Sequence, residues 1–234
     1  VLKLLIFCFL FSRFGFSQTN NVFALLKEVK EATYYDSAKL YNIGEKTIKK
    51  ANTLAIPGVD AEVHLYYGNY FFYTRNLTKA KQYFEKSLQE AKESKILNIE
   101  TLAKIRLSFL KYEDDSDKNE AEKELLDLLT FTKNKNDYQN EAELLNLIGI
   151  INEDKNKAKE AAKLYLEGLN LAETHNLPYY LAVFRNNLGL IKYYSDDLTG
   201  ALSDFEKASD IAEKENNKRL LSHIQMNLCM VNLS

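Results

Sequence analysis

The residues whose types could carry out chemistry are few and scattered along the chain. Its 234 residues include 3 histidines and 2 cysteines. None of His64, His175 and His223 has a metal-ligating side chain three or four residues after it, so a structural role is favoured for each. The chain has neither a glycine-rich phosphate loop nor a nucleophile elbow. We therefore predict no catalytic residue, no metal, no cofactor and no enzymatic activity.

One segment resembles a metal site more closely. "DSDKNE" begins like a calcium loop, with Asp115, Asp117 and Asn119 at alternate positions. A calcium loop needs glycine at its sixth position and glutamate at its twelfth, where this chain has Glu120 and Leu126. The segment is better interpreted as a turn between helices, with Asp117 near the helix cap.

The stretch "HLYYGNYFFY" places seven rings around Gly68. His64, Tyr67, Gly68 and Phe71 have the spacing of one helical face and are predicted to pack inward. A glycine inside a helix costs about 1 kcal/mol relative to alanine, so a packing reason is expected. We expect a small residue at the start of the following helix to face it, with an aromatic ring filling the adjacent gap.

The elements that would position these side chains repeat along the chain. Gly68, Ser108, Gly149 and Gly189 recur every 40 or 41 residues, which is typical of a stacked repeat array. With only 2 prolines and 8 glycines, the chain is predicted to be mostly helical. Each repeat is expected to hold two helices joined by a polar turn, and Thr78 and Thr199 are expected to cap second helices.

This pattern resembles the tetratricopeptide repeat over residues 57–215. Leu188-Gly189, Ala201, Phe205 and Ala208 match that family closely, Tyr67-Gly68, Phe71, Ala80 and Phe84 match well, and Ile148-Gly149, Ala161, Tyr165 and Gly168 also match. The second repeat is degenerate, with one inserted residue in its turn, and His64, Leu145 and Arg185 replace the family's tryptophan. The period of about 40 exceeds the family's usual ~34. The resemblance implies an all-α, right-handed superhelical solenoid of antiparallel helix pairs. The predicted packing residues are Gly68, Ala80, Phe84, Ser108, Ala121, Leu125, Gly149, Ala161, Tyr165, Gly189, Ala201, Phe205 and Ala208.

The predicted organisation begins with a signal peptide. Residues 1–17 hold Lys3, the apolar run "LLIFCFLF" and small residues at Gly15 and Ser17, which favours cleavage before Gln18 and an exported, periplasmic or extracytoplasmic protein. A buried N-terminal helix is the alternative. The further segments are 18–56 (a capping helix pair without the glycine and alanine marks), 57–96, 97–137, 138–177 and 178–217 (repeats), and 218–234 (the first helix of a truncated repeat). Because that last helix would leave Leu228 and its neighbours uncovered, we expect the native protein to continue beyond Ser234.

The expected binding surface is the concave side, which first helices line in such arrays. Its predicted ligand-binding residues lie one step around each helix from the packing stripe: Leu65, Asn69, Phe72, Tyr73, Ile105, Phe109, Tyr112, Asn146, Ile150, Glu153, Asn186, Leu190 and Tyr193. Rings would supply contact area and asparagines would bond a peptide backbone. The alternative is a solvated groove or contacts between repeats.

The partner is predicted to be a protein or peptide. Without residues 1–17 the chain has 29 basic and 33 acidic side chains and no basic stripe, which argues against nucleic acid. The export signal and long repeats resemble the exported sensor region of bacterial signalling proteins, which implies a membrane-anchored output domain beyond residue 234. A structural scaffold for a cell-envelope complex is the alternative function.

Overall fold

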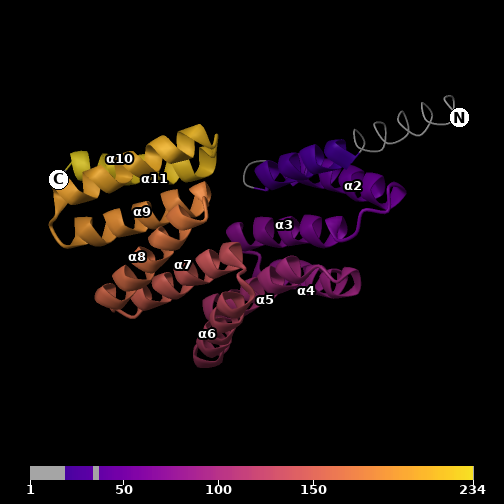
Figure 1. Ribbon diagram of the computed structural model, residues 1–234, viewed down its shortest axis with the longest axis horizontal. Helices are drawn as coiled ribbons and strands as arrows, with labels where there is room; N and C mark the ends of the chain where they lie inside the picture. The colour runs from indigo at the N-terminus through magenta and orange to yellow at the C-terminus, as the bar shows by residue number, and fades with distance from the viewer. Residues whose placement is uncertain (1–18, 34–36, 234) are drawn as a thin grey trace, which may run out of the picture. The chain divides into compact units, whose positions relative to one another are not determined.

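The computed structural model describes residues 19–33 and 37–233, and every regular element in those ranges is an α-helix (Figure 1). The predicted signal peptide, residues 1–17, lies outside them. A first helix covers residues 19–32. The others are α2 (Ser37–Thr53), α3 (Val59–Tyr73), α4 (Leu77–Ser94), α5 (Leu97–Glu113), α6 (Lys118–Lys135), α7 (Tyr138–Asp154), α8 (Ala158–Thr174), α9 (Pro178–Tyr194), α10 (Leu198–Lys214) and α11 (Lys218–Asn232). The prediction of an all-α fold of helix pairs is confirmed.

The chain divides into two compact units, and each is described by itself. Unit 1 ends at Asp114 and holds the helices up to α5, whereas unit 2 begins at Asp115 and holds α6 to α11. The division falls between the two helices expected to form the second repeat. The packing of Ser108 against Ala121 and Leu125 therefore stays a prediction, as do the boundaries of the repeats.

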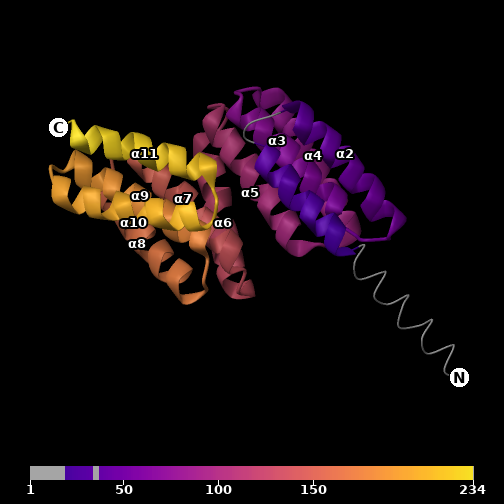
Figure 2. The same cartoon turned by 90° about the horizontal axis from the view of Figure 1, so that it is seen from above.

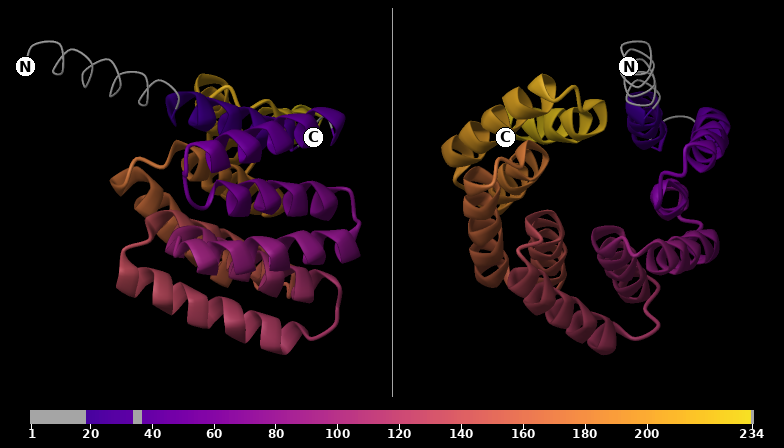
Figure 3. Two further views of the ribbon diagram at one scale, coloured as in Figure 1. Left: turned by 90° about the vertical axis from the view of Figure 1, so that its right-hand side faces the viewer. Right: turned by 45° about the vertical axis from the view of Figure 1, so that its right-hand side comes forward.

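Helix ends recur at regular intervals. Left-handed residues end or follow successive helices at Ala55, Arg75, Lys95, Asp115, Asn136, Asn156, Asn176, Asp196 and Asn216, 20 or 21 residues apart. This conformation turns the chain sharply after a helix and satisfies its last carbonyls. Helices that touch and are joined by so short a turn must run antiparallel. Such pairs include α3 with α4, α7 with α8, and α9 with α10 (Figures 2 and 3).

The caps of the second helices differ from the prediction. Asn76 and Asp197 are the N-cap residues of α4 and α10, and their side chains accept hydrogen bonds from the backbone N–H groups of Lys79 (3.2 Å) and Gly200 (2.9 Å). Thr78 and Thr199, the predicted caps, lie inside these helices. A cap must precede the first helical residue, and each threonine comes two positions too late. Asp117 caps α6 as expected, accepting from the N–H of Glu120 at 3.1 Å.

In the helix pairs, a glycine of the first helix packs against an aromatic ring of the second. A Cβ on Gly68 would lie 2.4 Å from the Phe84 ring, and the corresponding distances are 2.2 Å for Gly149 to Tyr165 and 2.6 Å for Gly189 to Phe205. The expectation that a small residue faces each glycine was wrong, because the nearest atoms all belong to the ring one turn further along. The missing Cβ lets the backbone of the first helix approach the ring closely. The structure leaves only 0–1% of Ala80, Phe84, Ala121, Leu125, Ala161, Tyr165, Ala201, Phe205 and Ala208 exposed.

A second set of small residues packs second helices against the following first helix. A Cβ on Gly168 in α8 would lie 2.1 Å from the Phe184 ring of α9. Gly44 has the same relation to α3, since its Cβ would lie 2.1 Å from the hydroxyl of Tyr67. No glycine mark was expected in the N-terminal helix pair. Gly44 was missed because it stands forty residues before Phe84, at the position where the repeat places a large side chain and no glycine is expected.

His64 faces the core of unit 1, as predicted. It is 6% exposed, and its Nδ1 lies 2.6 Å from a carboxylate oxygen of Glu90 in α4. Tyr67 and Tyr83 lie against the imidazole, with ring centroids 5.7 and 6.1 Å away. This histidine therefore ties α3 to α4.

Candidate functional site

A ladder of asparagine side chains links the first helices of unit 2. Asn187 of α9 donates from Nδ2 to Oδ1 of Asn146 in α7 at 2.8 Å. Asn227 of α11 donates in the same way to Asn186 of α9 at 2.7 Å. Asn186 in turn donates to its neighbour Asn187 at 3.3 Å, so the four amides form one chain across three helices.

The repeat itself builds this ladder. Asn146 and Asn186 stand three residues before Gly149 and Gly189, while Asn187 stands two before Gly189 and Asn227 two before Cys229. Gly149 and Gly189 fix the rotation of α7 and α9 against their rings, and in α11 Cys229 stands at the same repeat position, so equivalent positions turn to corresponding sides of the three helices. The helices α7, α9 and α11 touch in that order, which brings each amide within reach of the next.

The surroundings of the ladder are partly apolar and partly open. Asn186 is 9% exposed, and the other three amides are half-buried. The predicted face residues Ile150, Leu190 and Tyr193 are also half-buried, and no protein atoms cover them completely. We call this surface of α7, α9 and α11, with its four asparagines and these three side chains, the amide face.

The amide face can still form hydrogen bonds. Each asparagine carries two N–H donors and an oxygen that accepts twice. Within the described residues, Nδ2 of Asn146 and Oδ1 of Asn227 bond to no protein group. The free donor of Asn146 and the free acceptor of Asn227 stand at opposite ends of the ladder and can bond a C=O and an N–H group of an extended peptide.

Glu153 adds an ionisable group beside the amide face. Its carboxylate accepts a hydrogen bond of 2.6 Å from the hydroxyl of Tyr165, the ring that packs on Gly149. Burial raises the pKa of Glu153 above its usual range, although the bond from Tyr165 acts in the opposite direction. The predicted face residue is thus held by the core ring of the same helix pair.

In unit 1 the corresponding predicted residues are more buried. Leu65 and Ile105 are 1% and 0% exposed, so their placement on an open face was wrong. Both lie between packed helices, because the apolar stripe of α3 and α5 is wider than one helical row. Asn69 accepts from Nε of Arg106 at 3.1 Å.

The remaining predicted rings of unit 1 pack on one another. Phe72 contacts Phe109 with centroids 5.9 Å apart, and Phe109 stacks on Tyr112 at 6.3 Å. Phe109 and Tyr112 are 8% and 4% exposed, whereas Tyr73 is 38% exposed. Their role in binding a ligand stays a prediction.

Three residues of these polar contacts were missed from the sequence: Arg106, Asn187 and Asn227. All three stand two residues before the glycine position of their helix, at Ser108, Gly189 and Cys229. A search for polar side chains at one repeat position, followed helix by helix, would have found them.

Metal binding and membrane crossing would each require a recognisable group of residues. Within residues 19–33 and 37–233, no group of three or more His, Cys, Asp or Glu side chains could hold a metal ion. Asp115 of the calcium-like segment is instead paired with Lys118 at 3.1 Å. No helix in the described part of the chain combines the length and apolarity needed to cross a bilayer.

Comparison with known proteins adds information only at the level of the fold. No protein-family model and no curated protein matches this sequence. Three solved structures are similar: a Rap protein complexed with Competence and Sporulation Factor (TM-score 0.61, 13% identity), the Rap conjugation gene regulator of the plasmid pLS20 in complex with the Phr* peptide (0.54, 14%), and Aspartyl phosphate phosphatase F from Bacillus subtilis (0.56, 11%).

These similarities cover 94%, 90% and 91% of this chain but 71%, 69% and 60% of the respective neighbours, so the chain corresponds to part of each. At such low identity the likeness concerns the fold and not the activity. The chain has an all-α helical-repeat fold like that of the Rap proteins and of tetratricopeptide type.

Proposed function

We propose that this chain is a non-catalytic repeat protein that binds an extended peptide along the amide face of unit 2. The asparagine ladder is the observation that carries the proposal. Polar side chains aligned across three helices are unnecessary for packing, since the glycine–ring contacts already join each pair. The Phr* peptide bound by the Rap regulator of pLS20 belongs to that protein, and it supports a peptide as the ligand class here.

The dimensions of the amide face suit a short peptide. Packed helices lie roughly 8–10 Å apart, so three neighbouring first helices span about 20 Å. An extended chain advances about 3.3 Å per residue, so about six peptide residues would cross the face. Alternate side chains of the peptide would rest against Ile150, Leu190 and Tyr193, while its backbone bonds the amides.

The proposal is tested with random seven-residue peptides displayed on phage and selected on the purified chain. The best binder is resynthesised with a fluorophore, and its Kd is measured by anisotropy. Each backbone hydrogen bond contributes about 1 kcal/mol, so Asn146→Ala or Asn227→Ala should weaken binding about five- to tenfold. Asn170→Ala, at an exposed asparagine of α8, is the matched control and should leave the Kd unchanged.

Two results would overturn the proposal. One is a selected peptide whose affinity survives both ladder substitutions. The other is an equal loss of affinity in Asn170→Ala, which would indicate binding elsewhere on the chain. Circular dichroism of each variant separates a lost contact from a lost fold.

The name of the phosphatase neighbour belongs to that protein. For this chain we propose binding without catalysis, because the contacts of His64 and His175 are those of structural side chains. His64 is bonded to Glu90 at 2.6 Å, and His175 stacks on Tyr138 with centroids 3.5 Å apart.

We further propose that the chain is exported and serves as the sensor region of a larger signalling protein. The support is the charged, apolar and small-residue pattern of residues 1–17, which lie outside the described residues. Expression with this segment, followed by N-terminal sequencing of the extracytoplasmic fraction, should give Gln18 as the first residue. Recovery of the uncleaved chain in the cytoplasm would refute export and leave the peptide-binding proposal standing.

A further inference from the structure

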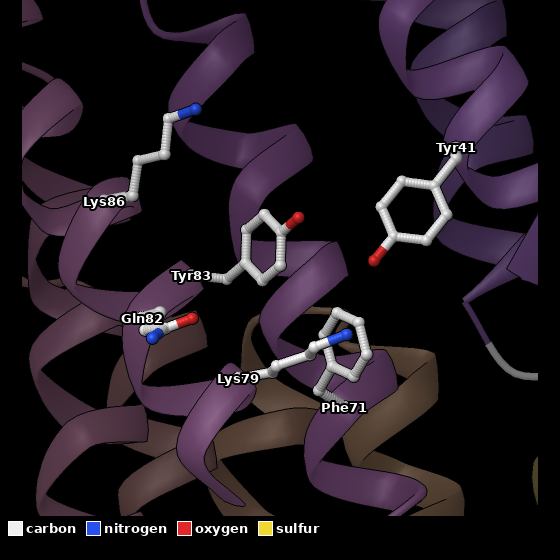
Figure 4. Close-up of a pocket in the computed structure, with 6 residues that line it drawn as sticks. All are labelled: Tyr41, Phe71, Lys79, Gln82, Tyr83 and Lys86. Carbon is white, nitrogen blue, oxygen red and sulfur yellow. The ribbon is translucent and has the colours of Figure 1, made fainter. Parts of the chain in front are cut away.

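Unit 1 contains a pocket that the peptide-binding proposal does not use. It lies where α2, α3 and α4 meet and has a volume of about 330 Å³ (Figure 4). Its lining consists of three rings, one amide and two ammonium groups: Tyr41, Phe71, Lys79, Gln82, Tyr83 and Lys86. Ligand pockets begin at about 300 Å³, so this one suits a molecule with a single ring.

One stripe of α4 supplies most of the lining. Lys79, Gln82, Tyr83 and Lys86 follow the spacing i, i+3, i+4, i+7 and share one helical face. The ammonium of Lys79 lies 5.0 Å from the centroid of the Phe71 ring. Figure 4 shows the Tyr41 side chain reaching from α2 toward the side chains of this stripe.

The two ammonium groups bring positive charge to the pocket, and no carboxylate is among its lining residues. In the part of the chain that the structure describes, neither Lys79 nor Lys86 forms an ion pair. The carboxylate one turn beyond Lys86 is Glu90, which bonds to His64 at 2.6 Å. Two cations beside aromatic walls with no carboxylate between them favour an anion with a flat apolar part.

The tyrosine hydroxyls can add donors. Burial raises the pKa of Tyr41 above its ordinary value. The phenol of Tyr41 therefore stays protonated near neutral pH and can donate to an acceptor.

The repeat does not require this stripe. Counted from the alanine mark, α8 has Glu160, Lys163, Leu164 and Glu167 at the same positions. Glu167 there pairs with Lys133 of α6 at 2.6 Å, so the position of Lys86 serves to join second helices in unit 2. In α10 the position of Tyr83 is occupied by Asp204, which pairs with Lys192 at 2.6 Å. Among the second helices that the structure describes, only α4 combines two unpaired lysines with a tyrosine at these positions.

We infer that this pocket binds a small aromatic anion, an aryl carboxylate or aryl phosphate, with its charged group between Lys79 and Lys86 and its ring against Tyr41 and Phe71. Lysine suits this role because its ammonium is a compact charge at the end of a flexible stem. The site lies in unit 1 and involves none of the amide-face residues. Its test is therefore independent of the test of peptide binding.

The test is a titration of the isotopically labelled chain with phenyl phosphate and, separately, benzoate, followed by NMR chemical shifts. Benzyl alcohol and inorganic phosphate are the matched probes that lack the charge and the ring. At least one aryl anion should bind at least tenfold more tightly than either of them, with shifts at Tyr41 and Tyr83. No binding by either aryl anion, or equal binding of inorganic phosphate, would overturn the inference.

Charge removal at single lysines locates the site. Lys86→Gln and Lys79→Gln should each weaken binding of the better aryl anion at least fivefold. Lys81→Gln is the control, since Lys81 is an exposed lysine of the same helix outside the pocket lining. An equal effect of Lys81→Gln would mean attraction by overall charge and would refute the assignment. All three lysines are exposed, so their variants should keep the wild-type helicity.

Discussion

The α3–α4 pair of unit 1 and the α7–α8 pair of unit 2 solve the same packing problem with one chemical difference. In both, a helical glycine lies against a ring, Gly68 against Phe84 and Gly149 against Tyr165. Tyr165 adds a hydroxyl that donates to Glu153 at 2.6 Å. The position of Glu153, four residues after the glycine, is Phe72 in unit 1. The glycine–ring contact that joins the two helices is thus the same in both pairs. The residue four positions after the glycine differs: it is an acceptor where the ring carries a hydroxyl and an apolar side chain where it does not.

The largest expected effect tests the shared part of this comparison. In Gly149→Ala, the added Cβ would lie 2.2 Å from a carbon of the fully buried Tyr165 ring. The ring or the helix must shift, and such overpacking costs about 1–3 kcal/mol, which outweighs the helix propensity gained from alanine. Urea unfolding should therefore give a lower midpoint for Gly149→Ala than for the wild type.

Gly200→Ala provides the control for that measurement. Its Cβ would lie 2.2 Å from a carboxylate oxygen of Asp197, which is the end of a cap side chain and can rotate away. Rotation weakens the cap on the Gly200 N–H, but alanine gains helix propensity of similar size, so we expect the two effects to offset each other to within about 0.5–1 kcal/mol. If both alanine variants unfold at the wild-type midpoint, the ring contact does not require glycine.

Exchanging the two rings tests the chemical difference. Tyr165→Phe removes one hydrogen bond to Glu153, which should cost about 0.5–1.5 kcal/mol. Phe84→Tyr should cost about 1–3 kcal/mol, because its buried hydroxyl would meet Phe72, which has no acceptor. The midpoint of thermal unfolding should be lower than that of the wild type for both variants. A raised midpoint for Phe84→Tyr would contradict the expectation that its hydroxyl lacks an acceptor.

Much of the fold could be predicted from the sequence because its signals are local and periodic. The glycine and alanine marks recur every forty residues, and breakers are scarce, which together indicate helix pairs. The partner of each glycine was predicted wrongly, since sequence spacing does not state which of two residues one turn apart comes closest. Gly44 was overlooked because no glycine or alanine mark accompanies it at the repeat spacing.

The candidate site was predictable only in outline. Asn146 and Asn186 were chosen for their position on first helices, and the structure links them through Asn187 and Asn227. A hydrogen bond between residues 41 positions apart depends on how each of the two helices is rotated about its axis. Hydrophobic periodicity predicts which face of a helix is buried, but it does not predict that rotation closely enough to place a single amide. The burial of Leu65 and Ile105 depends in the same way on neighbouring helices that the periodicity of one helix does not describe.

A pH measurement examines Glu153 itself. Burial raises its pKa in the folded chain, so the folded state binds a proton more tightly than the unfolded state. Its contribution to stability is complete below the ordinary glutamate pKa and is lost as pH rises through the raised folded value. Glu153→Gln should therefore unfold at a higher temperature than the wild type at pH 7, and the difference should shrink on acidification. Equal pH profiles for the two proteins would show that Glu153 is not strained by burial.

The smallest expected effect concerns the asparagines. Asn187→Ala removes the donor to Asn146 and the acceptor of Asn186. Asn146 is half-buried and Asn186 is 9% exposed, so both side chains lie near solvent. Water can replace part of the lost bonding, so the cost in stability should be about 0.5–1 kcal/mol, below that of the glycine and ring changes. Chemical unfolding of Asn187→Ala beside Asn170→Ala measures it. A loss of stability as large as that of Gly149→Ala would show that the ladder serves to stabilise the fold. The amide face would then not be available to bind a ligand.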